Sequence, residues 1–214
     1  MIMAIDLIQA EDVKRAKNAW DFVSGYLSEC NGFERCQLLS TFKEVKTRAN
    51  YPLASVCRWD SAEDWDNARA AARKDWEVIR VLRGSNTKFT GFTMDLVDGQ
   101  EYNFSRNRNA CVLLDVIYLD KSRMSGYAEM WNRCAAFMSS QPGYVNASLY
   151  QNQSLNDEIK FINIAEWDDA ESLFHAAHTD EFNEIVEPFM EDFALYLTNR
   201  AGISSVPMPQ GAVA

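Results

Sequence analysis

An amide and an indole are predicted to lie together at the end of one strand in the second half of the chain. In the segment 160–167, which reads KFINIAEW, Asn163 and Trp167 fall on the same face of a strand with period-two alternation. An unpaired buried amide costs roughly a few kcal/mol, so Asn163 needs a partner. That partner is either a substrate carbonyl or developing oxyanion, or a neighbouring backbone group.

The two histidines of the chain lie on the helix predicted to follow this strand. His175 and His178 are three residues apart and could share one helix face. Either imidazole could act as a general base near neutral pH; the alternative is a solvated helix residue. A two-histidine metal site would take its third ligand from Asp180 or Glu181. The sequence contains no metal-binding motif, and we therefore predict no metal.

The sequence repeats one unit. The motif WDSAE at 59–63 recurs as WDDAE at 167–171, an offset of 108 residues. Two earlier landmarks recur at an offset of 111 residues, namely Trp20 with Trp131 and Gly32 with Gly143. The predicted domains are a first repeat at 1–104, a second repeat at 109–204 and a flexible tail at 205–214.

Each repeat is predicted to fold as β-α-β-β-α-β, the ferredoxin-like order of an α+β protein. In the first repeat we expect strands at 1–8, 33–42, 53–59 and 89–97 and helices at 13–27 and 60–82, with a polar hairpin loop at 43–52. In the second repeat we expect strands at 111–119, 144–151, 160–167 and 193–198, a helix at 125–139, a helix capped by Asp168, and a further turn capped by Thr179.

A four-stranded sheet of this kind buries one face under its own helices and leaves the other face apolar. A second copy in the same chain can pack against this apolar face. We therefore expect an intramolecular dimeric α/β barrel, a pseudo-dimer within one chain. The sequence leaves open whether a further homodimer forms.

Charge and composition exclude several classes of protein. The chain has 214 residues and a net charge of −10, which makes nucleic acid an improbable partner. No apolar run is long enough for a membrane span, and the acidic N-terminus does not resemble a signal peptide. The five cysteines are scattered and lack CxxC spacing. We expect buried thiols in a reducing cytoplasm rather than disulfides or zinc.

These motifs resemble the antibiotic biosynthesis monooxygenase (ABM) family of the dimeric α/β-barrel superfamily. The resemblance covers nearly the whole chain as two fused copies, and it is carried by QPGY at 141–144 and by NIAEW at 163–167 before DDAE. It implies oxidation of a small phenolic, polyketide-like aromatic with O2, without metal or flavin.

The family's Asn-x-x-x-Trp spacing falls on Asn163 and Trp167. Its tyrosine shortly after the tryptophan is not reproduced, since Leu173 or Phe174 stands there. Haem-degrading relatives carry a ligating histidine after this helix, whereas residues 182–186 contain none.

Further aromatic residues could sandwich a planar substrate or simply pack the core. The candidates in the second repeat are Tyr144, Tyr150, Phe174 and Trp131; in the first repeat, Ser55 and Trp59 occupy the positions of Asn163 and Trp167. Two functions are consistent with this sequence. The first is a cofactor-independent monooxygenase in which Asn163, Trp167 and a histidine (His178 or His175) act on substrate. The second is a non-catalytic small-ligand-binding or stress-related protein with the same barrel.

Overall fold

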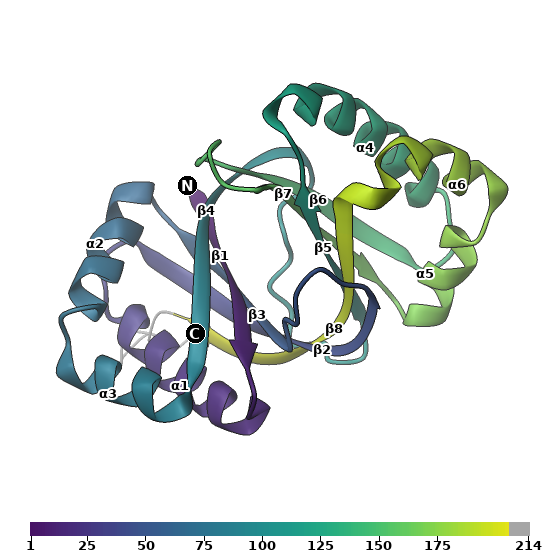
Figure 1. Ribbon diagram of the computed structural model, residues 1–214. Helices are drawn as coiled ribbons and strands as arrows, with labels where there is room; N and C mark the ends of the chain where they lie inside the picture. The colour runs from purple at the N-terminus through teal and green to yellow at the C-terminus, as the bar shows by residue number, and fades with distance from the viewer. Residues whose placement is uncertain (206–214) are drawn as a thin grey trace, which may run out of the picture. The chain divides into compact units, whose positions relative to one another are not determined.

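Each repeat folds in the predicted β-α-β-β-α-β order, with one helix of each pair divided (Figure 1). The computed structural model describes residues 1–205, so the predicted tail lies outside the described residues except for Ser205. The first repeat contains β1 (Ile2–Ala10), α1 (Val13–Ser28), β2 (Phe33–Lys46), β3 (Leu53–Trp59), α2 (Ala62–Ala72), α3 (Trp76–Ser85) and β4 (Thr87–Gly99). The second contains β5 (Cys111–Tyr118), η1 (Lys121–Arg123), α4 (Met124–Ser139), β6 (Tyr144–Asn152), β7 (Ile159–Trp167), α5 (Ala170–Ala177), α6 (Asp180–Val186), η2 (Glu187–Asp192) and β8 (Phe193–Ser205).

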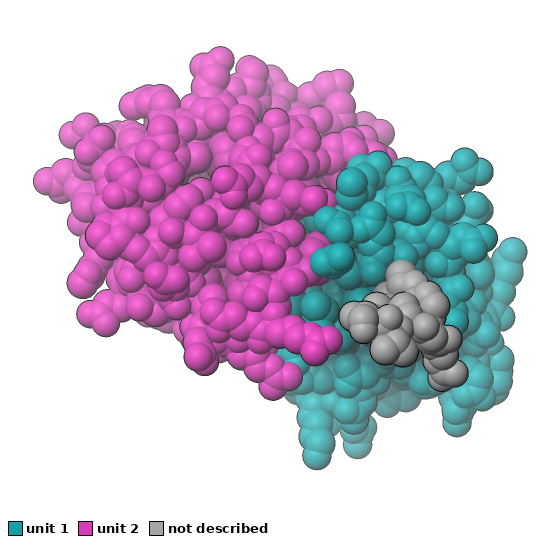
Figure 2. Space-filling view, turned by 180° about the vertical axis from the view of Figure 1, so that it is seen from behind, with its two compact units in different colours: residues 1–39, 51–93, 201–214 teal, residues 40–50, 94–200 magenta. Residues whose placement is uncertain are grey.

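The eight strands form a closed barrel in the order β1-β3-β2-β8-β5-β7-β6-β4. This confirms the predicted intramolecular α/β barrel. Unit 1 comprises Met1–Leu39, Tyr51–Thr93 and, among the described residues, Ala201–Ser205; unit 2 comprises Ser40–Asn50 and Met94–Arg200 (Figure 2). The repeat boundaries at 1–104 and 109–204 stay a prediction about the duplication. None of the helices in residues 1–205 is both long and apolar enough to cross a membrane.

The same turn begins the second strand of each repeat. Gly32 and Gly143 adopt positive φ values of 74° and 80°, a left-handed conformation that glycine takes without steric cost. Their carbonyl oxygens accept hydrogen bonds of 2.8 Å from the backbone N–H groups of Asp60 and Asp168, respectively. These matched contacts show that the duplication seen in the sequence is also a duplication of local structure.

The aromatic partner that follows each glycine is conserved in geometry as well. Phe33 meets Trp59 edge-on, with ring centroids 5.3 Å apart, and Tyr144 meets Trp167 edge-on at 5.5 Å. Edge-to-face pairs of this kind add to the free energy of burying the rings. Both tryptophans are almost fully buried, so they close the core at the end of β3 and of β7.

Several predicted boundaries were wrong. The last strand, predicted at 193–198, runs to Ser205, and β1 and β4 also extend by two residues beyond their predicted ends. The single helix at 60–82 is two helices, because Asp75 accepts a hydrogen bond from the Val78 N–H (3.0 Å) and caps α3. The cap of α5 is Asp169 rather than Asp168, since its carboxylate accepts from the Ser172 N–H at 2.8 Å. β2 continues through four residues that we assigned to a loop. Thr179 does cap α6, as predicted.

The expectation that no disulfide forms was also wrong. Cys36 on β2 and Cys57 on β3 form a disulfide, with Cα atoms 4.0 Å apart. The 21-residue separation gives no spacing signal, because only the pairing of neighbouring strands brings the two side chains together. Cys30, Cys111 and Cys134 are free thiols.

Candidate active site in unit 2

Unit 2 contains a cavity of about 330 Å³ between its strands and the helices α4, α5 and α6. Every residue of β7 is buried, and the face of this strand that carries Ala165 and Trp167 packs in the apolar cluster under the helices. The lining is mainly apolar and includes Tyr127, Trp131, Tyr144, Leu173, Phe174 and Phe193. A small apolar cavity with few polar groups is typical of a small-molecule site.

Asn163 is the centre of a hydrogen-bonded chain in this cavity. The indole Nε1 of Trp131 donates to Asn163 Oδ1 at 3.1 Å. Asn163 on β7 is paired in register with Asp115 on β5, and their side chains are hydrogen-bonded. Because the amide oxygen already accepts from Trp131, the amide N–H is the donor to Asp115. The partners of Asn163 are therefore two protein side chains, one of them an acid, rather than the backbone group or substrate group that we predicted.

Asp115 is a carboxyl group in an apolar environment. Burial raises its pKa to about 8, although the hydrogen bond from Asn163 opposes that change. Its Oδ1 is buried and has no hydrogen-bond partner among residues 1–205. Sequence analysis missed this residue. The available signal was a single acid in the middle of the apolar strand CVLLDVIY, since such a group is rarely buried without a reason.

Trp167 lines the cavity beside Asn163, as the period-two pattern indicates. Its indole Nε1 is buried and donates no hydrogen bond within the described part of the chain. Trp59 has the same unpaired Nε1 in the first repeat. The unpaired donor is therefore a property of the duplicated unit, but only at Trp167 does the ring line a cavity that contains an amide.

Two other titratable groups in the cavity are held in their protonated forms. Burial raises the pKa of Tyr127 well above its ordinary value, and the charge of Asp115 acts in the same direction. Burial and Asp115 also raise the pKa of the Cys134 thiol to about 12. A thiol with that pKa is a poor nucleophile near neutral pH. Among Asp115, Tyr127 and Cys134, Asp115 is thus the group whose charge changes closest to neutral pH.

The two histidines differ in position. His178 lines the cavity, and its Nδ1 lies 2.7 Å from the carbonyl oxygen of Phe174. A carbonyl can only accept, so Nδ1 carries a proton and Nε2 is the free ring nitrogen. His175 is exposed, lies 4.0 Å from Glu171 through its Nε2, and does not line the cavity. The structure therefore brings one histidine to the cavity mouth.

The other predicted contact residues divide between the two units. Tyr144, Phe174 and Trp131 line the cavity of unit 2. Tyr150 does not: its ring is buried elsewhere and its hydroxyl accepts from the Tyr102 N–H at 3.0 Å. Ser55 and Trp59 belong to unit 1, where Ser55 lines a separate cavity. Within residues 1–205, no group of three or more His, Cys, Asp or Glu side chains is arranged to hold a metal ion.

Fold and site together define a tandem α/β-barrel protein with a small-molecule cavity under the helices of its second repeat. Residues 116–188, a segment within the second repeat, match the family model described as antibiotic biosynthesis monooxygenase. A comparison with curated proteins finds no sequence match.

Solved structures share the tandem fold at low sequence identity. An anthrone oxidase-like protein superposes with a TM-score of 0.78 at 10% identity, covering 100% of this chain and 96% of that chain. A heme-degrading enzyme from Listeria monocytogenes has a TM-score of 0.51 at 12% identity, with coverage of 93% and 99%. A major regulator of staphylococcal pathogenesis has a TM-score of 0.51 at 6% identity, with coverage of 91% and 97%. The fold therefore hosts unlike functions, and activity must be argued from the site.

Proposed function

We propose that unit 2 is a monooxygenase that oxidises a small phenolic aromatic with O2 and needs neither a metal nor a flavin. The observation that carries this proposal is the hydrogen-bonded chain from Trp131 through Asn163 to Asp115 in an apolar cavity. It supplies a proton acceptor beside a fixed donor pair, in a space that excludes most water. The family match of residues 116–188 supports this class of reaction.

Asp115 acts as the general base. As a carboxylate it removes the proton of the substrate hydroxyl, and its pKa of about 8 is closer to that of a phenol than an ordinary aspartate would be. The resulting phenolate gives one electron to O2. Recombination of the two radicals forms a peroxide anion on a ring carbon. The proton held by Asp115 returns to it and gives a hydroperoxide, and loss of water from that carbon leaves a quinone carbonyl. One O2 is consumed, one oxygen atom enters the product, and the other leaves as water.

In this reaction, Asn163 and Trp167 donate hydrogen bonds to the carbonyl or peroxy oxygen of the substrate. The Asn163 side chain is fixed by Trp131, so its amide does not have to reorganise when charge develops on the substrate. The unpaired Nε1 of Trp167 gives a second donor for a carbonyl or peroxy oxygen. Tyr144 and Phe174 supply aromatic surface for a planar ring. The dry cavity protects the phenolate and the radical pair from side reactions.

Oxygen consumption by metal-depleted protein tests this proposal directly. The substrates are a panel of anthrones and polycyclic phenols, and the variant is Asn163→Ala, which should lower turnover by roughly 10- to 1000-fold. Asn132→Ala is the matched control, because Asn132 follows Trp131 on α4 but is exposed and does not line the cavity. It should retain the turnover of the parent protein.

Each alternative outcome has a definite meaning. Turnover that survives Asn163→Ala would remove Asn163 from the mechanism. Turnover that requires added metal or flavin would contradict the cofactor-free chemistry. If no phenol is oxidised but one binds in the cavity, unit 2 is a ligand-binding module and the enzyme proposal fails.

A further inference from the structure

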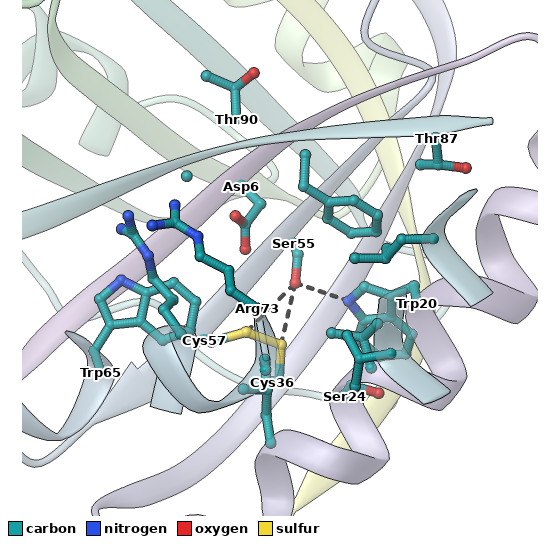
Figure 3. Close-up of a pocket in the computed structure, with 18 of the residues that line it drawn as sticks. Asp6, Trp20, Ser24, Cys36, Ser55, Cys57, Trp65, Arg73, Thr87 and Thr90 are labelled. Carbon is teal, nitrogen blue, oxygen red and sulfur yellow. Dashed lines mark hydrogen bonds between the residues drawn. A yellow bond between two sulfur atoms is a disulfide. The ribbon is translucent and has the colours of Figure 1, made fainter. Parts of the chain in front are cut away.

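Unit 1 contains a cavity of its own, of about 540 Å³, that the proposed oxygenase site does not use. Figure 3 shows its centre, where Asp6 extends from β1 and Ser55 from β3 toward the same space. The indole of Trp20 on α1 and the disulfide between Cys36 and Cys57 lie beside Ser55. This volume is within the range of cavities that hold small organic ligands.

The cavity has the same framework as the site in unit 2. Trp20 Nε1 donates to Ser55 Oγ at 2.8 Å, just as Trp131 donates to Asn163. Asp6 is paired in register with Ser55 across β1 and β3, and this pairing repeats that of β5 with β7. The acid, the hydrogen-bonding residue and the indole therefore recur together. Unit 1 retains the architecture of a binding site although its central amide is replaced by a hydroxyl.

The acid of unit 1 lies against a glycine, whereas the acid of unit 2 lies against a side chain. In unit 2, Asp115 is paired with Leu195, which lines that cavity. In unit 1, Gly91 lies against Asp6, and a Cβ atom added there would be 2.5 Å from Asp6 Oδ1. The Asp6 carboxylate therefore occupies the space that a side chain at position 91 would need. This carboxylate makes no hydrogen bond to another described residue, so its oxygen atoms can accept from a ligand.

The charge of the lining distinguishes this cavity from that of unit 2. Arg69 and Arg73 at the end of α2 and Arg83 on α3 all line it, against the single acid Asp6. Arg69 is half-buried with its guanidinium 5.5 Å from the centre of the Trp65 ring, while Arg73 and Arg83 are exposed at the rim. None of the three lies within 4.0 Å of an acid among the described residues. Burial raises the pKa of Asp6, but the charge of Arg69 does act on this acid and lowers its pKa by a smaller amount. Three guanidinium groups and one acid around one cavity contrast with a chain whose net charge is −10.

We propose that unit 1 binds a second small molecule, an aromatic carboxylate, independently of the oxygenase site. Its ring would lie in the apolar interior near Trp20 and Trp65, and its carboxylate would meet the arginines, whose planar groups bind carboxylates by paired hydrogen bonds. The Asp6 carboxylate can accept a hydrogen bond from a hydroxyl on the same ligand.

Calorimetric titration of the full chain with 2-naphthoate tests this proposal, because 2-naphthamide has nearly the same shape without the charge. We expect one molecule of 2-naphthoate per chain and at least roughly tenfold weaker binding of the amide. The double variant Arg73→Gln/Arg83→Gln should lose a similar factor in affinity for 2-naphthoate. Arg80→Gln is the matched control, because Arg80 on α3 is exposed, pairs with Glu77 at 2.7 Å and does not line the cavity.

A second variant tests whether the ligand lies beside Gly91, by adding a side chain there. Gly91→Leu introduces the side chain that unit 2 carries against its acid and should abolish 2-naphthoate binding, with folding checked by thermal melting. The proposal is overturned if 2-naphthoate does not bind at millimolar concentration, or if the amide binds equally well. It is also overturned if binding survives the arginine double variant, or if Asn163→Ala removes it and so places the ligand in unit 2. None of these measurements depends on oxygenase activity.

Discussion

Asp115 is the one acid among the described residues that line the cavity of unit 2, and the proposed chemistry depends on it. Asp115 is surrounded by apolar side chains and has only the Asn163 amide to stabilise its charge, so the protonated form is favoured up to about pH 8. Burying such a base lowers the free energy of unfolding, but its raised pKa allows proton transfer near neutral pH. A group that destabilises the fold and has a shifted pKa is typical of functional sites rather than of structural ones.

We predict that turnover depends on the ionisation of Asp115. The carboxylate is the active form and its pKa is raised, so kcat should increase as the pH rises through about 8 and level off above that. Asp115→Asn keeps the size of the side chain but cannot accept the proton. It should lower kcat by about 100-fold or more and remove this rise. The measurement is a pH profile of oxygen uptake from pH 6 to 10, and a rise that persists in Asp115→Asn would assign it to another group.

Residue types and spacing revealed part of this site. The spacing predicted that Asn163 and Trp167 would lie together, and Trp131 was one of several aromatic candidates for substrate contact or core packing; all three line one cavity. Asp115 could not be placed in the same way, because its importance comes from its register with Asn163 across two strands. Periodicity gives the face of a strand, whereas register depends on the partner strand.

At the scale of elements, a buried ion pair connects β7, β8 and the link between the repeats. Arg200 and Glu166 form an ion pair with only 2% and 3% of their side chains exposed. Glu166 also accepts from the Asn103 N–H at 3.1 Å, and Arg200 donates to the Asn103 carbonyl at 3.2 Å. The segment that we predicted to be a polar link is therefore fixed on unit 2 by this pair.

We predict that removing the acid of this pair is strongly destabilising. Glu166→Ala leaves the Arg200 guanidinium buried without a countercharge, which should lower the free energy of unfolding by roughly 3–5 kcal/mol. Glu77→Ala is the control, because its pair with Arg80 is exposed and should be worth at most about 1 kcal/mol. Urea denaturation monitored by circular dichroism measures both. Equal effects of the two variants would contradict a special role for the buried pair.

The strand pairing of β2 with β3 gives a chemical prediction. With Cys36 and Cys57 in a disulfide, unfolded protein without reductant should react with iodoacetamide at three cysteines, namely Cys30, Cys111 and Cys134. After reduction, all five should react. Mass spectrometry of the intact chain counts the adducts. Five adducts without reductant would show that the two thiols are not joined in the purified protein.

Boundaries of elements were predicted best where the local sequence determines them. The bounds of β3 were predicted without error because apolar residues run from Leu53 to the Trp-Asp turn. β2 was predicted too short, since its polar continuation is stabilised by contacts distant in sequence. Thr47 and Ala49 beyond it, for example, both meet the hydroxyl of Tyr196. The break before α3 was missed because the apolar pattern continues through a capping aspartate.

For the whole molecule, fusing two copies in one chain allows each copy to change its site separately. A homodimer of one repeat must carry the same side chains twice, whereas here Ser55 stands where the second repeat has Asn163. Gly91 likewise lies against the acid of unit 1, where unit 2 has Leu195. The duplicated landmarks predicted the barrel because they are matched in sequence. The different linings of the two cavities could not be predicted, since they come from unmatched residues on α2, α3 and β4.

We predict that oxygenase activity cannot be moved to unit 1 by exchanging the central residue. Asn163→Ser should reduce oxygen uptake as strongly as Asn163→Ala, because a serine cannot both accept from Trp131 and donate an amide N–H to Asp115. Adding Ser55→Asn to that variant places an amide beside Trp20 but leaves the arginines of that cavity and the glycine against Asp6 unchanged. The double variant should therefore show no more uptake than Asn163→Ser alone, with thermal melting as the check on folding. If the second substitution restores turnover, the two cavities are chemically equivalent, and the division of function between the repeats rests on that single residue.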